Sequence, residues 1–535
     1  MKHLTFLVLA AALPAQAPSV PFPPGNPFTA SKALLGKALF WEEQLSSTNT
    51  IACGTCHEPK FGGADGRCTT LGEDARNAGN DGVLGTPDDK IASRGPSTSD
   101  ANGTLQQHEY FGLAPVVGTR QAPTVINAAF QTVFFADGRV HSGFFRDPIT
   151  RTPVLTSGAH LENLIVEPPI NESEMAHIDR TWVDIENRLV QIVPLELSPQ
   201  LSSDLQAWIA GRDYPALFQE AFGTPEVTAS RAIMAIATYL RTQVSFGSPF
   251  DMGTLTPRQL HGQQLFSALL CATCHTPPLF TDGQFHNTGV RPPSEDLGRG
   301  EFTGDPFDSG KFRTPTLRNV ALRDRFFHNG QFSSLEEVID FYQRSGDFVP
   351  NEIPITFTSG WSTFTENDRA DLVSFLEALT DPAVATESHP FDRPELGADR
   401  APERFGERTA GSDGFEPRMI AFEPASTKNA SFTIGVDRGI GYHNAFLALS
   451  AGAASTPLEI LGASIHVALD SRLIALINHG PLDGIGPGAG TKMVTWDLTQ
   501  APGLQGLELF GQWLFLDPGS EAGLSATEAI RIRFY

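Results

Sequence analysis

Basic residues are scarce in this sequence. Its 535 residues include 38 Lys and Arg against 61 Asp and Glu, so the formal net charge at pH 7 is −23. A protein that binds nucleic acid needs a basic surface to neutralise phosphates, and this balance excludes that class of partner. A strongly acidic surface instead suits a protein that remains in solution and meets basic partners.

Long apolar runs are also lacking, except at the start of the chain. No later segment reaches the ~20 apolar residues that a membrane-spanning helix needs, so we expect no transmembrane segment. At the start, Lys2 precedes an apolar stretch over residues 4–13 and an A-x-A site at residues 15–17. This pattern is typical of a cleaved signal peptide, which we place at residues 1–17. A buried N-terminal helix is the alternative. We expect an exported protein, periplasmic or at the cell surface.

Cysteine is rare as well. The chain has 5 cysteines, and an odd number cannot all pair in a disulfide framework. Cys68 has no motif around it, and we assign it no role. The other four form two C-x-x-C-H units, Cys53-Gly54-Thr55-Cys56-His57 and Cys271-Ala272-Thr273-Cys274-His275.

The spacing of these units has a chemical reason. Two thiols three positions apart can each form a thioether with a haem vinyl group, and the next residue, a histidine, can then bind the iron. A zinc site or a redox dithiol is the alternative. Two such units in an exported chain favour two covalently bound c-type haems. We predict that Cys53 and Cys56 attach one haem, that Cys271 and Cys274 attach the other, and that His57 and His275 bind the iron atoms.

Helix signals dominate the chain before residue 385. Capping boxes begin at Thr256, Ser334 and Thr365, each ahead of a helix with spaced apolar residues. Residues 204–241 predict two helices separated by Gly223. We expect a mainly α protein with two cytochrome c-like domains, residues 18–245 with inserted loops and residues 246–385.

The texture of the sequence changes after residue 381. Residues 386–414 are rich in Pro, Gly and charge and predict a linker. Residues 415–535 contain short alternating apolar runs separated by turn residues, which predicts an all-β, sandwich-like accessory domain. The expected strands cover residues 430–436, 445–449, 460–469, 493–498, 507–516 and 529–535.

One acidic insertion allows two interpretations. Residues 77–89 (NAGNDGVLGTPDD) place Asp81, Asp88 and Asp89 among glycines. Carboxylate and carbonyl oxygens of such a loop can bind Ca²⁺. A solvated acidic turn explains the same residues, because the spacing does not match an EF-hand.

At this point the sequence resembles the bacterial di-haem cytochrome c peroxidase and MauG family over residues 30–380. The resemblance implies two cytochrome c-like domains that face each other, an N-terminal haem that meets H₂O₂ and a C-terminal haem that relays electrons. The matching stretches are residues 35–40 (LGKALF), 120–130 (RQAPTVINAAF), 135–139 (FADGR), 171–175 (NESEM), 312–321 (FRTPTLRNVA) and 327–330 (FHNG).

Two further site residues are implied by the resemblance. Glu174 falls where the family keeps a catalytic glutamate, which can take a proton from peroxide and return it to the leaving oxygen. Tyr342 lies fourteen residues after His328, where MauG places a tyrosine that binds the second haem iron. The alternatives are a surface glutamate and a core tyrosine.

The sequence also departs from the family. Ala136 stands where the family has a tryptophan between the haems, Leu164 where a glutamine is frequent, and Gln121 where an asparagine helps to bind calcium. Residues 141–160 form an inserted loop. No histidine follows the first motif closely, although His108 is a candidate distal ligand, so we expect a five-coordinate first haem.

These features lead to two functional hypotheses. The first is a periplasmic di-haem peroxidase or oxidase that reduces H₂O₂. Its electrons would come from a small cytochrome c, a cupredoxin or a protein substrate. The second is a non-catalytic di-haem electron carrier with a C-terminal binding or anchoring domain, because the substitutions at Ala136 and Leu164 remove groups that a peroxidase uses.

Overall fold

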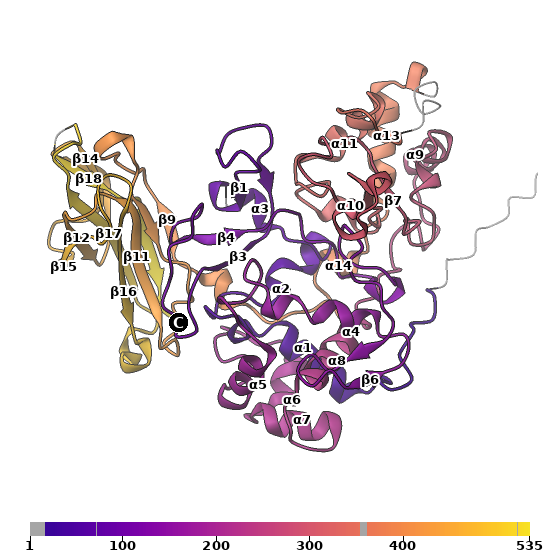
Figure 1. Cartoon of the computed structure of the whole chain (residues 1–535), viewed down its shortest axis with the longest axis horizontal. Helices are drawn as coiled ribbons and strands as arrows, with labels where there is room; N and C mark the ends of the chain where they lie inside the picture. Colours follow the sequence, from indigo (N-terminus) through magenta and orange to yellow (C-terminus); the bar gives the residue numbers. More distant parts are fainter. Residues whose placement is uncertain (1–16, 71, 354–360, 522) are drawn as a thin grey trace, which may run out of the picture.

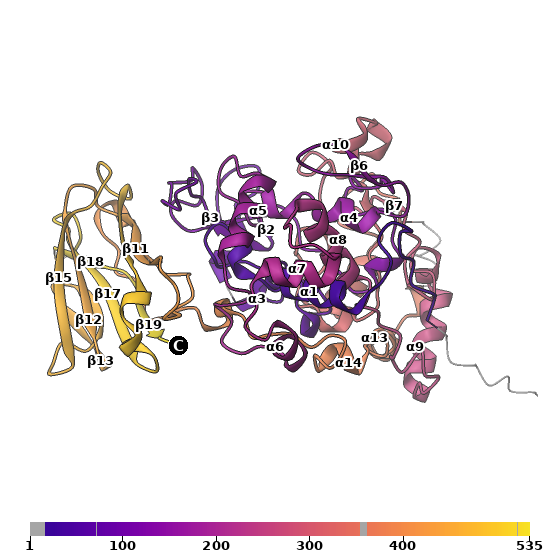
Figure 2. The same ribbon diagram turned by 90° about the horizontal axis from the view of Figure 1, so that it is seen from below.

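Three units follow one another in space as they do in the sequence. The computed structural model describes residues 17–70, 72–353, 361–521 and 523–535. The β-rich unit lies at one end of the molecule and the second helical unit lies toward the other (Figures 1 and 2). The signal peptide expected at residues 1–17 falls outside the described residues, apart from Ala17. No described helix is long and apolar enough to cross a membrane.

The first helical unit is built around a close helix crossing. Gly36 of α1 (Ala30–Phe40) faces α8 (Ala229–Leu240), and a Cβ added to Gly36 would lie 2.0 Å from the carbonyl oxygen of Ala235. Only glycine therefore allows these two helices to touch. The remaining helices of this unit are α2 (Cys53–Cys56), α3 (Arg67–Thr70), α4 (His160–Ile165), α5 (Trp182–Gln191), α6 (Ser203–Ile209) and α7 (Tyr214–Phe222).

The second helical unit repeats this crossing. Gly262 of α9 (Pro257–Ala268) faces α13 (Glu366–Glu377), and its added Cβ would lie 2.0 Å from the carbonyl oxygen of Asp371. The capping boxes predicted at Thr256, Ser334 and Thr365 are present. The other helices here are α10 (Arg299–Thr303), α11 (Leu335–Gln343) and α14 (Pro382–Ala385).

Two asparagines join the helical units. Asn127 and Asn319 both have left-handed backbone, with φ of 61° and 58°. The Asn127 amide donates to the carbonyl oxygen of Ser245 at 3.1 Å, and the Asn319 amide donates to the Ser245 hydroxyl at 3.0 Å. Equivalent residues of the two repeats therefore meet at one serine.

Short strand pairs lie in the loops of the helical units. An inserted segment over residues 72–119 carries two of these pairs and lies between the β-rich unit and the first helical unit (Figure 1). The pairs are β1 (Arg76–Asn77) with β2 (Lys90–Ile91), β3 (Arg94–Ser97) with β4 (Pro115–Val117), β5 (Phe145–Arg146) with β6 (Pro153–Leu155), and β7 (Phe285–His286) with β8 (Phe312–Arg313).

One expectation about helices is wrong and another is not confirmed. Residues 204–241 hold three helices rather than two, because Ala210 and Gly211 adopt left-handed backbone and end α6 before Asp213 caps α7. Helices make up only 28% of the chain, so a mainly α protein is not confirmed. Long loops and the β-rich unit account for the difference.

The C-terminal unit is rich in antiparallel strands. One sheet has the order β10-β11-β16, and a second has the order β15-β12-β17-β19-β9, with β18 paired to β17. A separate two-stranded sheet pairs β13 with β14. Ile434 and Val436 of the first sheet and Leu447 and Trp513 of the second share one buried core, as in a sandwich. The bounds are β9 (Glu403–Phe405), β10 (Arg418–Ile420), β11 (Phe432–Gly439), β12 (Asn444–Ser450), β13 (Ala453–Ile460), β14 (Ala463–Val467), β15 (Leu473–Pro481), β16 (Gly490–Trp496), β17 (Glu508–Leu516), β18 (Leu524–Ala526) and β19 (Ala529–Arg533).

The segment expected as a linker contributes to this unit. β9 lies within residues 386–414, yet it pairs with β19 in antiparallel register. This part of the segment is therefore a sheet edge rather than a free connection.

Candidate active site

A cavity of about 930 Å³ lies in the first helical unit and reaches the inserted segment and the β-rich unit. Cys53, Cys56, His57 and Glu174 all line it. The structure therefore brings together the first predicted haem-attachment motif and the predicted catalytic glutamate, which are far apart in the sequence.

The first motif is held by a short helix that begins at Cys53. The backbone N–H of Ala52 donates to the Thr55 hydroxyl at 2.8 Å, which closes the turn. Gly54 lies against the Trp41 ring, and an added Cβ would come within 2.2 Å of it. The two residues between the cysteines therefore close the turn and let it pack against Trp41 at the end of α1.

The orientation of His57 leaves one ring nitrogen available. Its Nδ1 lies 3.2 Å from the carbonyl oxygen of Gly63. A carbonyl only accepts, so Nδ1 carries the proton and Nε2 keeps its lone pair. Burial lowers the pKa of His57, which favours the neutral ring. A neutral imidazole with a free Nε2 is the form that binds iron.

The second motif repeats this arrangement in the other helical unit. Cys271 begins a short 3₁₀ turn, and the His275 Nδ1 donates to the carbonyl oxygen of Phe280 over 3.1 Å. Burial lowers the pKa of His275 as well. Both histidines therefore present Nε2 as the nitrogen that can bind iron.

Tyr342 of α11 lies near the second motif. It is half-buried, and its hydroxyl makes no hydrogen bond within the described part of the chain. Burial raises its pKa. A phenol that has no hydrogen bond to the described residues and lies beside the second attachment motif fits the predicted axial ligand, which stays a prediction.

The thiols do not have the character of a redox dithiol. Burial raises the pKa of both Cys53 and Cys271 to about 12. A catalytic C-x-x-C pair instead needs a thiol whose pKa is lowered by nearby positive charge. This alternative therefore loses support.

Glu174 follows a tight turn in which its backbone N–H donates to the carbonyl oxygen of Asn171 at 3.0 Å. Burial raises the pKa of its carboxyl to about 7, with a further rise from Glu167 and an opposing effect of Arg139. A carboxyl with such a pKa can both accept and give a proton near neutral pH.

Comparisons with known proteins match both helical units to cytochrome families. A model of the di-haem cytochrome c peroxidase family matches residues 30–256, and a model of the cytochrome c family matches residues 260–380. The chain belongs to the di-haem cytochrome c peroxidase and MauG family. Both models end before the β-rich unit.

Individual proteins match over a similar share of this chain. The methylamine utilization protein MauG of Methylorubrum extorquens is 29% identical over 379 residues, which cover 69% of this chain and 84% of that protein. Cytochrome c peroxidase Ccp of Escherichia coli is 27% identical over 68% of this chain and 61% of its own length. The crystal structure of a MauG-like protein associated with microbial copper homeostasis has a TM-score of 0.48 and 24% identity, covering 72% of this chain and 98% of that one.

As a member of this family, the chain is a di-haem oxidoreductase with two covalently bound c-type haems. The residues present fit the first haem, because a large cavity adjoins two half-buried cysteines and a histidine whose Nδ1 faces the carbonyl oxygen of Gly63. The second motif offers the same groups, two cysteine sulfurs and one histidine.

The positions that depart from the family all lie on the first cavity, which Gln121, Ala136 and Leu164 line. The Gln121 amide donates to the carbonyl oxygen of Ile91 at 2.5 Å, so this amide is engaged within the protein. The tryptophan, glutamine and asparagine expected from the resemblance are therefore replaced at residues that line the site itself.

His108 also lines the cavity, but its ring is oriented differently from that of His57. The Tyr110 backbone N–H donates to the His108 Nδ1 at 3.1 Å. Because Nδ1 accepts, the proton of the neutral ring is on Nε2, which then has no lone pair for iron. This geometry favours a loop histidine over a distal ligand.

The acidic insertion is satisfied by its own backbone. Asp88 accepts from the backbone N–H groups of Asn80 and Asp81, and the Gly85 N–H donates to Asp89 at 2.8 Å. These bonds fit the acidic turn, and calcium binding stays a prediction.

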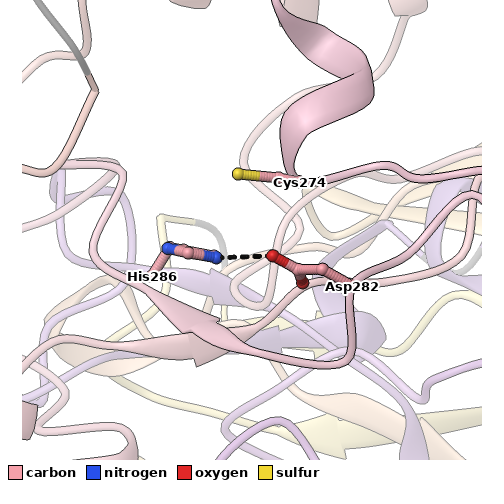
Figure 3. Close-up of side chains that lie close together, drawn as sticks. All are labelled: Cys274, Asp282 and His286. Atoms are coloured by element: carbon pink, nitrogen blue, oxygen red, sulfur yellow. Dashed lines mark hydrogen bonds and ion pairs between the residues drawn. The ribbon is translucent and has the colours of Figure 1, made fainter.

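One cluster of possible metal ligands occurs in the described residues, formed by Cys274, Asp282 and His286 (Figure 3). The His286 Nε2 lies 2.9 Å from Asp282, so these two groups already pair. Cys274 belongs to the second haem motif, and a thioether sulfur is not available as a thiolate. The cluster therefore gives no support to a zinc site.

The sequence did not reveal several cavity residues. Arg313 comes from the second helical unit, and Arg418 and Arg438 come from the C-terminal unit. Their positions depend on contacts between units, for which no local pattern in the sequence exists.

Proposed function

We propose that this chain is an exported di-haem peroxidase that reduces H₂O₂ at the N-terminal haem and receives electrons through the C-terminal haem. The observation that carries the proposal is the Glu174 carboxyl. It shares a cavity with Cys53, Cys56 and His57 and has a pKa of about 7.

A bound haem supplies a redox-active iron next to which the peroxide O–O bond can break. The role of Glu174 is to move one proton. Its carboxylate oxygen accepts the proton of one peroxide oxygen and returns it to the other oxygen, which leaves as water. The net reaction, H₂O₂ + 2 H⁺ + 2 e⁻ → 2 H₂O, takes the other protons from solvent.

The electrons come from a partner of basic character, such as a small cytochrome c or a cupredoxin. The net charge of −23 supports this choice, because complementary charge accelerates the encounter of two proteins. A protein substrate is the second candidate source of electrons. We place the protein in the periplasm on the basis of the expected signal peptide.

The alternative is an electron carrier without peroxidase activity. Ala136 and Leu164 on the cavity wall favour it, because neither can relay an electron through an aromatic ring or donate a hydrogen bond to peroxide. Phe134 and Phe135 line the same wall and provide aromatic rings there.

A comparison of Glu174→Gln with the wild-type holo-protein tests the proposal. We expect a high-spin ferric signal that responds to H₂O₂ in the wild type, and a rate of peroxide reduction lowered by about 10²–10⁴-fold in the variant. Glu172→Gln is the matched control, since Glu172 is exposed two positions away. Two low-spin haems that ignore peroxide would instead establish the electron carrier.

A further inference from the structure

We propose that the C-terminal β unit forms part of the first haem site. It holds residues 108–114 in place as the outer wall of the cavity, and this wall restricts entry to small molecules. The inference deepens the proposed function, on which it rests for the identity of the small substrate. It gives the β unit a role beyond anchoring.

The wall begins as a closed turn. The backbone N–H of His108 donates to the carbonyl oxygen of Gly112 at 2.8 Å, and the Gly112 N–H donates back at 3.0 Å. The turn between them presents its residues to the cavity, whose lining includes His108, Glu109, Tyr110 and Phe111. Tyr110 is 61% exposed and thus lies where the cavity meets solvent.

A buried ion pair of the β unit holds this turn. Arg418 of β10 and Asp437 of β11 lie 2.6 Å apart, with side chains only 9% and 2% exposed. Arg418 also donates to the carbonyl oxygen of Phe111 at 2.7 Å, and Asp437 accepts from the Leu113 N–H at 3.1 Å. Because each charge satisfies both its partner and the turn, moving the turn would leave buried polar groups unpaired.

A β-bulge directs these side chains. The register of β11 against β16 shifts between Val436 and Gly439, and Arg438 has a φ of 58°, which is rare outside glycine. Bulges re-aim side chains at functional sites. Here Asp437 contacts the turn, and the next residue, Arg438, lines the cavity.

Further contacts fix the same interface. Leu113 and Ala114 pack with Ile420 of β10 in one buried cluster. Arg404 of β9 forms an ion pair with Asp74 of the inserted segment. The wall is therefore attached to the β unit through Leu113 and Ala114, and it cannot swing open without breaking buried contacts.

The consequence is selection by size. Peroxide and other small ligands can pass, whereas a bulky organic molecule meets the clamped turn. We therefore expect the first haem to bind cyanide faster than it binds imidazole.

Stopped-flow binding of cyanide and of imidazole to the full-length ferric holo-protein tests this. In Asp437→Asn and in Tyr110→Ala we expect imidazole to bind about tenfold faster than in the wild type, while the rate of cyanide binding stays within about twofold. Tyr110→Ala guards against a folding defect, because Tyr110 is largely exposed. Arg472→Gln is the control, since it breaks an exposed pair with Asp470 in the same unit and Arg472 does not line the cavity.

Unchanged imidazole rates in both variants would overturn the inference, as would a wild-type protein that binds neither ligand. Peroxide turnover is measured separately on the same samples. If turnover is absent while the size selection holds, the proposed function fails and the inference about the wall stands.

Discussion

His57 points its Nδ1 at the carbonyl oxygen of Gly63, 3.2 Å away. His275 makes the equivalent contact with Phe280 at 3.1 Å. His108 does the reverse, because its Nδ1 accepts a backbone N–H. The direction of one hydrogen bond thus separates the two histidines fit to bind iron from the third, although all are histidines near a haem site.

The first prediction follows from this contrast. Replacing His108 by Ala should leave the electron paramagnetic resonance and visible spectra of the ferric protein unchanged, because His108 does not bind the first iron. Conversion of a low-spin signal to a high-spin signal in His108→Ala would show that it does.

The second prediction concerns pH. Glu174 must be ionised to accept a proton, and its pKa is about 7. The peroxide-dependent rate should therefore rise about tenfold per pH unit below that value and level off above it. In Glu174→Gln this dependence should vanish along with most of the rate. A wild-type profile that is flat between pH 5 and 8, in rapid-mixing experiments, would remove Glu174 from the reaction.

The third prediction concerns the second haem. Tyrosinate stabilises ferric iron more than a thioether does, so Tyr342→Met should raise the reduction potential of this haem. Redox titration followed in the visible spectrum measures the change. Phe341→Leu is the control for general packing, because Phe341 is the preceding residue of the same helix and is fully buried. An unchanged potential in Tyr342→Met would show that Tyr342 is a core residue.

Parts of this structure could be predicted because their signals are local. Each C-x-x-C-H unit carries its chemistry within five residues, and Thr256 with Gln259 forms a capping box in sequence and structure alike. All six apolar runs expected as strands contain strands. β13 was not predicted because Pro457 interrupts its sequence. β15 was not predicted because its apolar residues do not alternate with polar ones.

The site was less predictable wherever it depends on contacts between units. Glu174 was found through a family motif, but the rise in its pKa arises from burial, which one sequence does not report. Arg418 and Asp437 lie in a unit with no catalytic pattern. Their place at the cavity follows only from the docking of β10 and β11 on the inserted segment.

The last prediction concerns stability. Arg318 and Asp251 form a paired contact at 2.8 and 2.7 Å, and both side chains are 1% exposed. Burial alone would raise the pKa of Asp251, but the bonds from Arg318 and Ser248 outweigh it and hold the pKa below its ordinary value. The pair therefore stabilises the fold above the unfolded pKa of about 4 and loses this effect as pH falls through the lower, folded value.

Arg318→Met should cost about 3–5 kcal/mol at pH 7, because it leaves Asp251 charged, buried and unpaired. The deficit should shrink as the pH approaches about 4, where Asp251 of the variant takes up a proton and the charge disappears. Guanidinium unfolding followed by the haem absorbance at both pH values measures it. Arg472→Met, at an exposed pair, should change nothing measurable. An equal deficit at both pH values would mean that lost packing, rather than the stranded charge, destabilises the variant.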